Sequence, residues 1–140
     1  MKKVRILVLV LACILAVGIL SSCSSEKVTA KVTITIDADD DAILTNYELT
    51  VEGTAETPPT VLQAMREAMT MREIAYVDSE ESIESILSYV PYEDEAFSYY
   101  WDYTVNGVAP SSGRSNSYVI KDGDVIRYFF YPLDKAKITG

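Results

Sequence analysis

The chain has 140 residues, a formal net charge of −9 and no histidine. That length suffices for one domain with a buried core, and the acidic surface disfavours DNA, RNA and anionic lipid head groups as partners. Without histidine, the sequence cannot form a Ser-His-Asp or Cys-His catalytic site or a His/Cys zinc site. Carboxylates remain as candidate catalytic groups, and no pair of them stands out.

The first 22 residues have the features of a bacterial export signal. Three positive charges, on Lys2, Lys3 and Arg5, precede an apolar stretch from Ile6 to Leu20. This stretch is shorter than the roughly 20 residues that a membrane-spanning helix needs. The following Leu20-Ser-Ser-Cys23 resembles the lipobox of bacterial lipoproteins, in which the cysteine is acylated.

We therefore expect residues 1–22 to be a removed signal peptide, Cys23 to carry the lipid and residues 23–27 to form a short tether. The protein would then lie at the extracytoplasmic face of the bacterial cell membrane, held there by its acyl chains. The alternatives are an uncleaved membrane anchor and plain secretory cleavage. A lone exposed thiol argues against secretion because it would be reactive. Cys13 leaves with the signal, so the fold must depend on packing without a disulfide.

Two strands are predicted ahead of the first helix. Apolar and polar residues alternate strictly from Val28 to Ile36, a pattern typical of a strand with one solvated face. The acidic run from Asp37 to Asp41 breaks this pattern. Alternation resumes from Tyr47 to Val51 and predicts a second strand that ends at Gly53.

The acidic run has the spacing of a calcium-binding loop. Asp37, Asp39 and Asp41 fall at positions 1, 3 and 5, and Glu48 falls at position 12. However, Ala42 takes the place of the glycine at position 6, and the flanking segments are predicted strands instead of helices. We take a solvated hairpin loop as the main interpretation and calcium binding as the alternative.

One amphipathic helix is predicted from Val61 to about Arg72. Thr60 and Gln63 have the spacing of a capping box, and apolar residues follow at helical intervals. The methionines of this segment, Met71 included, are interpreted as core residues because methionine fills irregular gaps.

The segment after the helix is ambiguous. A short strand is predicted from Ile74 to Val77. Residues 79–90 fit either a helix or a strand and turn, and we favour the strand. Further on, the aromatic run from Phe97 to Val105 predicts a strand that ends at a turn.

The last predicted strand runs from Val125 to Tyr131 and stops at Pro132. Several strands with one clear helix between them indicate an α+β domain.

The C-terminal third resembles a known domain family. Trp101-Asp-Tyr-Thr-Val-Asn-Gly107, followed after a loop by Tyr118-Val-Ile-Lys-Asp-Gly-Asp-Val-Ile126, resembles the family DUF4430, which is related to the C-terminal β-domain of transcobalamin and intrinsic factor. Thr60-Val-Leu-Gln-Ala-Met65 also matches the family's helix start, Thr-Val-Leu-x-Ala-Leu. The resemblance implies that residues 28–140 form a β-grasp-like mixed sheet with one amphipathic helix packed on one face.

The resemblance also implies a binding role without catalysis. In the best-known relatives, this domain caps one face of a corrin ring, while a second, helical domain holds the other face. A corrinoid-like cofactor is therefore a candidate ligand of a membrane-anchored binding module, although none is required for the fold. A glycan and a surface protein are other candidate partners. The alternatives are an assembly or adhesion module whose last strand joins a partner's sheet and, least favoured, a carboxylate-based surface enzyme.

The aromatic strands contain the candidate ligand-binding residues. Alternation places Tyr100, Phe129 and Tyr131 on the sheet face away from the helix, and an exposed aromatic patch often marks a binding surface. The competing interpretation is that residues 79–95 cover this face.

The loop from Ala109 to Asn116 adds Ser112 and Arg114 as further candidates, because it is longer than a hairpin needs and rich in hydrogen-bond donors. A solvated loop without a ligand is its default interpretation.

Five further residues are interpreted as structural. Trp101 is assigned to the core face of its strand. The turn chemistry of Asn106-Gly107 and of Asp122-Gly123 explains the remaining four.

Overall fold

The computed structural model describes residues 25–111 and 114–137. The predicted signal peptide, the lipidation site Cys23 and the candidate ligand-binding residue Ser112 lie outside the described residues. No helix in the described ranges is long and apolar enough to cross a membrane.

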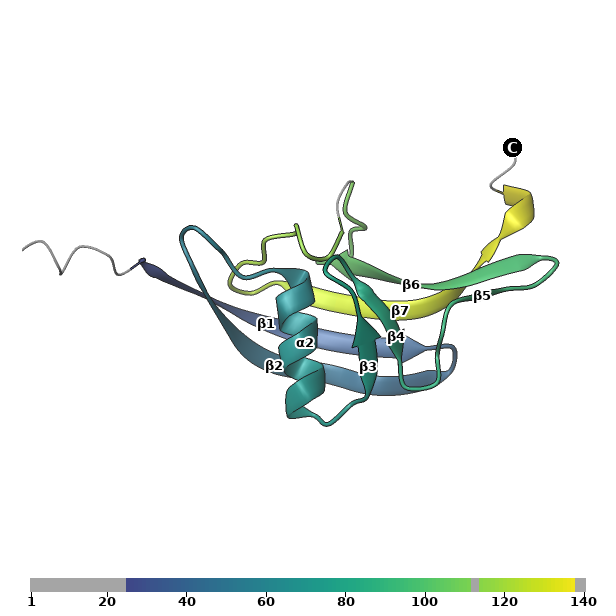
Figure 1. Ribbon diagram of the computed structural model, residues 1–140, viewed down its shortest axis with the longest axis horizontal. Helices are drawn as coiled ribbons and strands as arrows, with labels where there is room; N and C mark the ends of the chain where they lie inside the picture. Colours follow the sequence, from purple (N-terminus) through teal and green to yellow (C-terminus); the bar gives the residue numbers. More distant parts are fainter. Residues whose placement is uncertain (1–24, 112–113, 138–140) are drawn as a thin grey trace, which may run out of the picture.

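The described residues form an α+β fold, in which one helix lies across one face of a five-stranded sheet (Figure 1). The strand order is β2-β1-β7-β6-β5, and a two-stranded ribbon, β3-β4, lies beside the helix. The elements are β1 (Lys27–Ala38), β2 (Asp41–Thr54), α2 (Val61–Met71), β3 (Tyr76–Asp78), β4 (Ile83–Ile86), β5 (Tyr92–Glu93), β6 (Phe97–Val105), β7 (Val125–Asp134) and the 3-10 helix η1 (Lys135–Lys137).

The sheet is mixed because β1 pairs antiparallel with β2 and parallel with β7. β7 also pairs antiparallel with β6 along the whole of β6. β7 is therefore an interior strand from Ile126 to Phe130, and the alternative hypothesis that this strand joins a partner's sheet is wrong for that stretch. A strand with neighbours on both sides has no free hydrogen-bonding edge.

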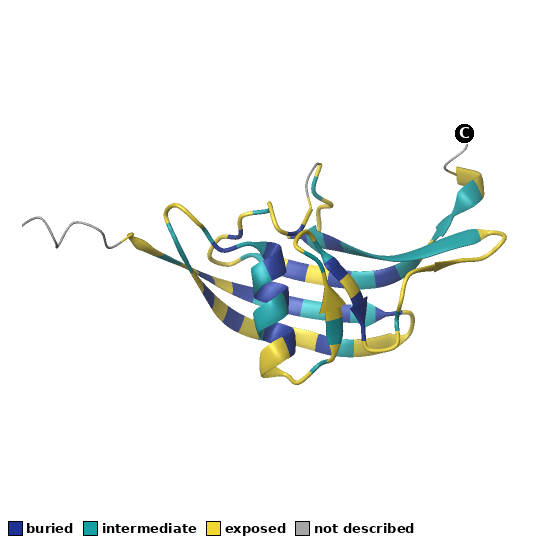
Figure 2. Ribbon diagram, viewed as in Figure 1, coloured by how far each residue is buried: buried dark blue, intermediate teal, exposed yellow. Residues whose placement is uncertain are grey.

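The predicted alternation of β1 is confirmed. Four residues of β1 are buried on the helix side of the sheet: Ala30, Val32, Ile34 and Ile36. Lys31 is exposed on the opposite side. Buried and exposed residues consequently alternate along the strands in Figure 2.

The acidic run interrupts the first hairpin less than expected. β1 continues to Ala38 and β2 begins at Asp41, which leaves only Asp39 and Asp40 in the turn. Asp39 adopts a positive φ of 49° there, a conformation that aspartate tolerates better than most residues.

The predicted helix is confirmed, and it is joined to the sheet at its start. The Thr60 hydroxyl accepts a hydrogen bond from the Gln63 amide at 3.4 Å, as an N-cap does. The Gln63 side chain does not complete a capping box. Its Nε2 donates instead to the carbonyl oxygen of Glu52 at 2.8 Å, which links α2 to β2.

Met65 and Met69 of the helix are fully buried, as predicted, but Met71 is 61% exposed. Met71 is the last residue of α2, and its sulfur accepts a hydrogen bond from the Tyr47 hydroxyl at 3.7 Å. Assigning it to the core was therefore wrong.

The strand-and-turn interpretation of residues 79–90 is confirmed by β4 and by the turn that follows it at Leu87. Pro132 does not stop the last strand, which continues to Asp134 with Pro132 opposite Tyr99. Because β1 ends opposite Phe130, β7 has only one neighbour at this point, where a sheet tolerates proline.

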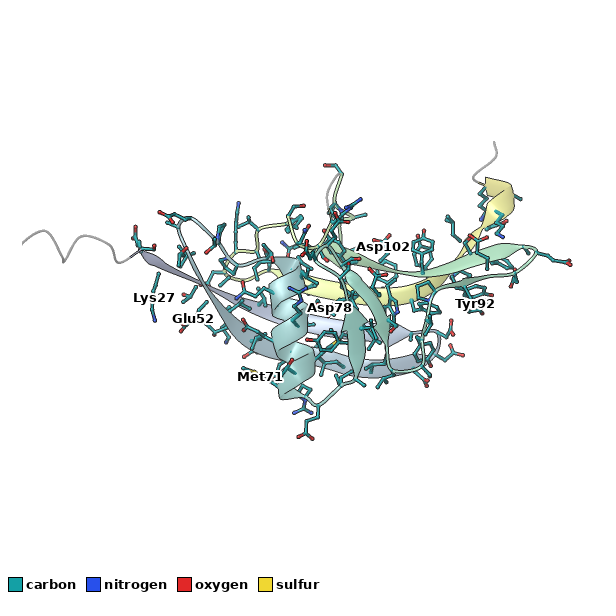
Figure 3. The ribbon with its side chains drawn as sticks, in the orientation of Figure 1. Lys27, Glu52, Met71, Asp78, Tyr92 and Asp102 are labelled. Atoms are coloured by element: carbon teal, nitrogen blue, oxygen red, sulfur yellow. The ribbon has the colours of Figure 1, made fainter. Side chains whose placement is uncertain are left out.

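The molecule is elongated, and its N-terminal strand and the β5 strand lie at opposite ends. In Figure 3, Lys27 at the start of β1 and Tyr92 of β5 are labelled at the two extremes of the long axis. The helix covers the middle of the sheet between them.

Candidate ligand-binding site

The sheet has one face covered by α2 and one face that no described element covers, which we call the outer face. On β7, Ile126, Tyr128 and Phe130 point to the helix side and are buried. Arg127 lies between them in sequence, faces the other way and is exposed. The period of two along a strand therefore assigns Phe129 and Tyr131 to the outer face.

Tyr100, Phe129 and Tyr131 come together on the outer face, and we call them the outer aromatic patch. The Tyr100 and Tyr131 residues are paired across β6 and β7, with ring centroids 4.9 Å apart and their hydroxyls hydrogen-bonded to each other. The Phe129 ring lies 5.2 Å from that of Tyr131. All three are half-buried, so part of each ring remains accessible.

The surroundings of the patch are polar, and two of their charges, on Arg127 and Asp37, are paired with each other. Arg127 lies over the Phe129 ring, 5.4 Å from its centroid, and its Nε donates to Asp37 at 2.7 Å. Burial, together with the hydrogen bond to Tyr131, raises the pKa of Tyr100. The patch therefore offers ring faces and hydroxyl groups, with the carboxylate of Asp102 next to it on β6, opposite Phe129.

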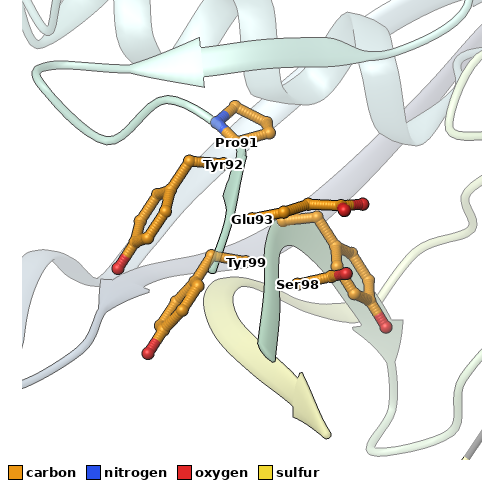
Figure 4. Close-up of a pocket in the computed structure, with 6 residues that line it drawn as sticks. Pro91, Tyr92, Glu93, Ser98 and Tyr99 are labelled. Atoms are coloured by element: carbon orange, nitrogen blue, oxygen red, sulfur yellow. The ribbon is translucent and has the colours of Figure 1, made fainter. Parts of the chain in front are cut away.

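A pocket of about 250 Å³ opens at the β5 end of β6 and adjoins the patch (Figure 4). Its lining residues are Pro91, Tyr92, Glu93, Ser98, Tyr99 and Tyr100, so Tyr100 belongs to both the pocket and the patch. The Tyr92 and Tyr99 rings are stacked, with centroids 4.3 Å apart and planes 10° apart.

One wall of the pocket is held in place by the 3-10 helix η1. Lys135 of η1 donates from Nζ to the Glu93 carboxylate at 3.0 Å and to the carbonyl oxygen of Asp94 at 2.8 Å. The hydrogen bond and the charge of Lys135 lower the pKa of Glu93. Glu93 is thus a carboxylate acceptor in the pocket at neutral pH.

Residues 83–90 do not cover the outer aromatic patch, so the competing interpretation is wrong for them, while Pro91, Tyr92 and Glu93 line the pocket beside Tyr100. Tyr89 packs against Trp101 and Phe130, with ring centroids 6.4 and 5.7 Å away, on the helix side of the sheet. The Trp101 Nε1 also donates to the carbonyl oxygen of Tyr89 at 3.0 Å. The segment therefore closes the end of the core.

The structure does not bring Arg114 to the outer aromatic patch. Arg114 forms an ion pair with Glu81, ahead of β4. Next to it, Ser115 is buried, and its carbonyl oxygen accepts a hydrogen bond from Leu62 of α2 at 2.9 Å. The loop is held against the helix start because the first helical N–H groups need acceptors, and this places Arg114 on the helix side.

The residues interpreted as structural lie in turns or against the core. Asn106 and Gly107 have φ values of 54° and 78°, and the Asn106 side chain accepts from the Val125 amide at 2.9 Å. Asp122 accepts from the Lys31 amide at 2.7 Å, and Gly123 has a φ of 87°. Trp101 is half-buried against the core.

The four carboxylates of the calcium alternative are not brought together. Asp37 pairs with Arg127, Asp41 accepts from the Tyr89 hydroxyl, and Glu48 pairs with Lys31 at 2.9 Å. Within residues 25–111 and 114–137, no group of three or more Asp, Glu, His or Cys side chains is placed to hold a metal ion.

Sequence reasoning missed Tyr92, Glu93 and Ser98 of the pocket. β5 contains only two residues, too few for a pattern of alternation to be recognised. The sequence feature that could have indicated the pocket is the pair of tyrosines, Tyr92 and Tyr99, at the two ends of a short connection. These two residues pair across the β5-β6 hairpin.

These features define a sheet-and-helix domain with an uncovered aromatic surface. The chain belongs to the family described as "Domain of unknown function (DUF4430)", whose model matches residues 59–130. A search of curated proteins finds no match.

The chain is similar in fold to haptocorrin, in a crystal structure of that protein in complex with Cbi. The two share 19% identity with a TM-score of 0.55, over 75% of this chain and 25% of that one. This chain thus matches only about a quarter of the length of haptocorrin. A "putative metal binding protein" from Ruminococcus gnavus ATCC 29149 matches with 14% identity and a TM-score of 0.43, over 74% of this chain and 98% of that one; similarity at that level does not establish a common fold.

Proposed function

We propose that this chain is a non-catalytic ligand-binding module that is anchored outside the cell through a lipid on Cys23. The observation that carries the proposal is the outer aromatic patch on the uncovered sheet face, which shares Tyr100 with a pocket at the β5 edge of the sheet. Aromatic ring faces with hydroxyls at their rims suit a flat or ring-shaped ligand that is apolar on its face. A corrinoid-like cofactor is the first candidate, since haptocorrin, which shares the fold, was crystallised with Cbi.

A β-grasp-like arrangement is part of the proposal. The antiparallel β1-β2 hairpin leads into α2, and the last strand returns parallel to β1 in the middle of the sheet. This order of hairpin, helix and central parallel pair supports the assignment.

The position of the site agrees with attachment through the N-terminus. Tyr92, which lines the pocket, lies at the end of the molecule opposite Lys27 (Figure 3). A tether at residues 23–27 would leave that end remote from the point of attachment and accessible to a ligand.

Two of the carboxylates near the patch support binding over catalysis. Asp37 and Glu93 are held in ion pairs with Arg127 and Lys135. A general acid needs a raised pKa to hold its proton near neutral pH, whereas Lys135 lowers the pKa of Glu93. These groups are suited to accept hydrogen bonds from a ligand.

Titration of the full chain in detergent with cobalamin tests the proposal. Trp101 is the only tryptophan of the sequence, and its ring packs on Phe130, which in turn stacks on Tyr99 of the pocket. The fluorescence of Trp101 and the absorbance of cobalamin therefore both report binding. We expect a Kd in the micromolar range that Tyr100→Ala weakens about tenfold or more, which corresponds to roughly 1.4 kcal/mol.

Tyr47→Ala is the matched control, because Tyr47 is a half-buried tyrosine next to the end of α2 on β2, the edge strand opposite β5 and its pocket. It should leave the affinity unchanged. No binding at millimolar cobalamin would exclude a corrinoid ligand, and concentration-dependent oligomers in its place would favour the assembly alternative.

A further inference from the structure

We infer that the turn around Leu87 is a docking surface for a peptide segment of a partner protein that carries both apolar and basic side chains. Three large apolar or aromatic side chains of this segment are largely exposed: Leu87 is 52% exposed, Val90 57% and Tyr92 52%. We call these three residues the apolar tip. Of these three residues only Tyr92 lines the pocket, and none belongs to the outer aromatic patch. The apolar tip is therefore a separate surface.

Tyr89 fixes the apolar tip to the body of the protein. Its ring packs on Trp101 and Phe130, and its hydroxyl donates to Asp41 at the start of β2. Its backbone also closes a tight turn, with the Tyr89 amide donating to the carbonyl oxygen of Ile86 at 3.0 Å. Because Tyr89 points inward, the segment is held firmly while Leu87 and Val90 project into solvent.

The backbone conformation of Leu87 is costly, and about half of its side chain stays exposed although its amide donates to the carbonyl oxygen of Ala75 at 2.8 Å. Its φ of 53° lies in the left-handed region, which costs a bulky L-residue about 1–2 kcal/mol. Among the described residues other than glycine with a positive φ, Leu87 is the one with an apolar side chain. Glycine or asparagine would fit this turn at lower cost. A leucine here is explained by a contact that its side chain makes outside the chain.

Carboxylates beside the apolar tip determine the charge of the partner. Tyr89 brings the tip next to the hairpin turn, where Asp39, Asp40 and Asp41 are all exposed. In the described part of the chain, none of these three carboxylates forms an ion pair. The hydrogen bond from Tyr89 to Asp41, together with burial and the charges of Asp41 and Asp39, raises the pKa of Tyr89. An apolar surface beside uncompensated negative charge is complementary to a peptide with lysine or arginine next to apolar residues.

Selection from a random peptide library displayed on phage, against the full chain in detergent, tests this inference. We expect the enriched peptides to combine basic and apolar residues. A synthetic copy of one should bind by calorimetry and lose affinity at least about tenfold against Leu87→Gly. The same substitution should leave the melting temperature unchanged or raise it, because glycine accepts the positive φ. A loss of binding without a loss of stability separates docking from a structural role.

Val108→Gly is the matched control, since Val108 is 68% exposed in a different turn, and it should not change peptide affinity. Replacing Asp39 and Asp40 together by asparagine should weaken binding and reduce its dependence on salt.

Three results would overturn the inference: no enrichment, selected peptides without basic residues, or equal binding to Leu87→Gly. Self-association or binding to phosphatidylcholine vesicles that Leu87→Gly abolishes would assign the tip to a second copy or to a lipid surface instead. Leu87 lies outside the pocket and the outer aromatic patch, so Leu87→Gly should bind cobalamin as the unchanged chain does. Failure of the peptide-docking proposal therefore does not decide the corrinoid proposal, and the reverse holds too.

Discussion

At the scale of single residues, Gly53 is the position where the backbone of β2 lies closest to the chain that enters α2. A Cβ atom placed on Gly53 would lie 2.7 Å from the carbonyl oxygen of Thr57 and 2.8 Å from Cδ of Pro59. The Thr54 amide donates to the same Thr57 oxygen at 3.0 Å, which holds the two segments together. Glycine is required here by space.

We predict that Gly53→Ala destabilises the protein by about 1–3 kcal/mol, the usual range for an overpacked site. Urea denaturation of the full chain, followed by circular dichroism, measures the change. Gly107→Asn is the control: no atom lies within 4 Å of a Cβ at Gly107, so its only cost is the φ of 78°, which asparagine adopts more readily than most residues and which should cost less than the close approach at Gly53. An equal cost for the two variants would show that the close approach at Gly53 is unimportant.

At the scale of elements, the start of α2 depends on Thr60. Its hydroxyl caps the helix, and its backbone forms an isolated β-bridge with Val119. We predict that Thr60→Ala lowers the free energy of unfolding by about 1 kcal/mol, because the Gln63 amide loses its acceptor. Thr60→Ser keeps the hydroxyl and should recover most of this loss in the same urea experiment. A serine variant as unstable as the alanine variant would contradict a capping role.

The short strand β5 is the second element whose stability rests on few contacts. β5 makes only two residue pairs with β6, and Lys135 ties it to the C-terminal helix through Glu93 and Asp94. We predict that Lys135→Ala leaves global stability nearly unchanged, since exposed ion pairs contribute little. It should increase amide hydrogen exchange from Tyr92 to Ser98.

Lys27→Ala is the control for this prediction, because it removes an exposed ion pair with Glu52 at the other end of the sheet. Its effect on exchange should stay near β1 and β2. Unaltered exchange around β5 in Lys135→Ala would mean that the Lys135 side chain does not hold the β5-β6 hairpin.

At the scale of the whole molecule, buried tyrosines couple stability to high pH. Burial, with the charges of Tyr128 and Asp102, raises the pKa of Tyr103 to about 12, and burial also raises the pKa of Tyr128. An unfolded chain releases these protons near pH 10. Between pH 10 and 12 the unfolded state therefore binds fewer protons than the folded state. The stabilising contribution is complete below pH 10 and is lost as the pH rises.

We predict that the urea midpoint falls steadily from pH 10 to 12 and that it falls less steeply in Tyr103→Phe. Val51→Ala is the control, because it removes buried volume without a titrating group and should lower the midpoint equally at every pH. The same slope for Tyr103→Phe and the wild type would show that Tyr103 does not contribute to the alkaline transition.

Local patterns predicted the elements of this fold well and the site only in part. The alternation of β1, the helix start at Thr60 and the aromatic strand β6 were all correct, because each depends on residues close in sequence. Membership of the family was also recognised from local motifs. Met71 and Pro132 were misassigned because burial and the end of a strand depend on which neighbours the fold supplies.

The sequence by itself determined the α+β composition, the faces of the strands and the glycine and asparagine turns, since side-chain periodicity and backbone preference act over a few residues. Only the tertiary structure decided that Tyr100, Phe129 and Tyr131 form one patch, that a pocket adjoins it and that Arg114 lies elsewhere. These arrangements follow from the register of β6 against β7 and from the acceptors that the start of α2 requires. Both are contacts between segments far apart in the chain, which local patterns do not encode.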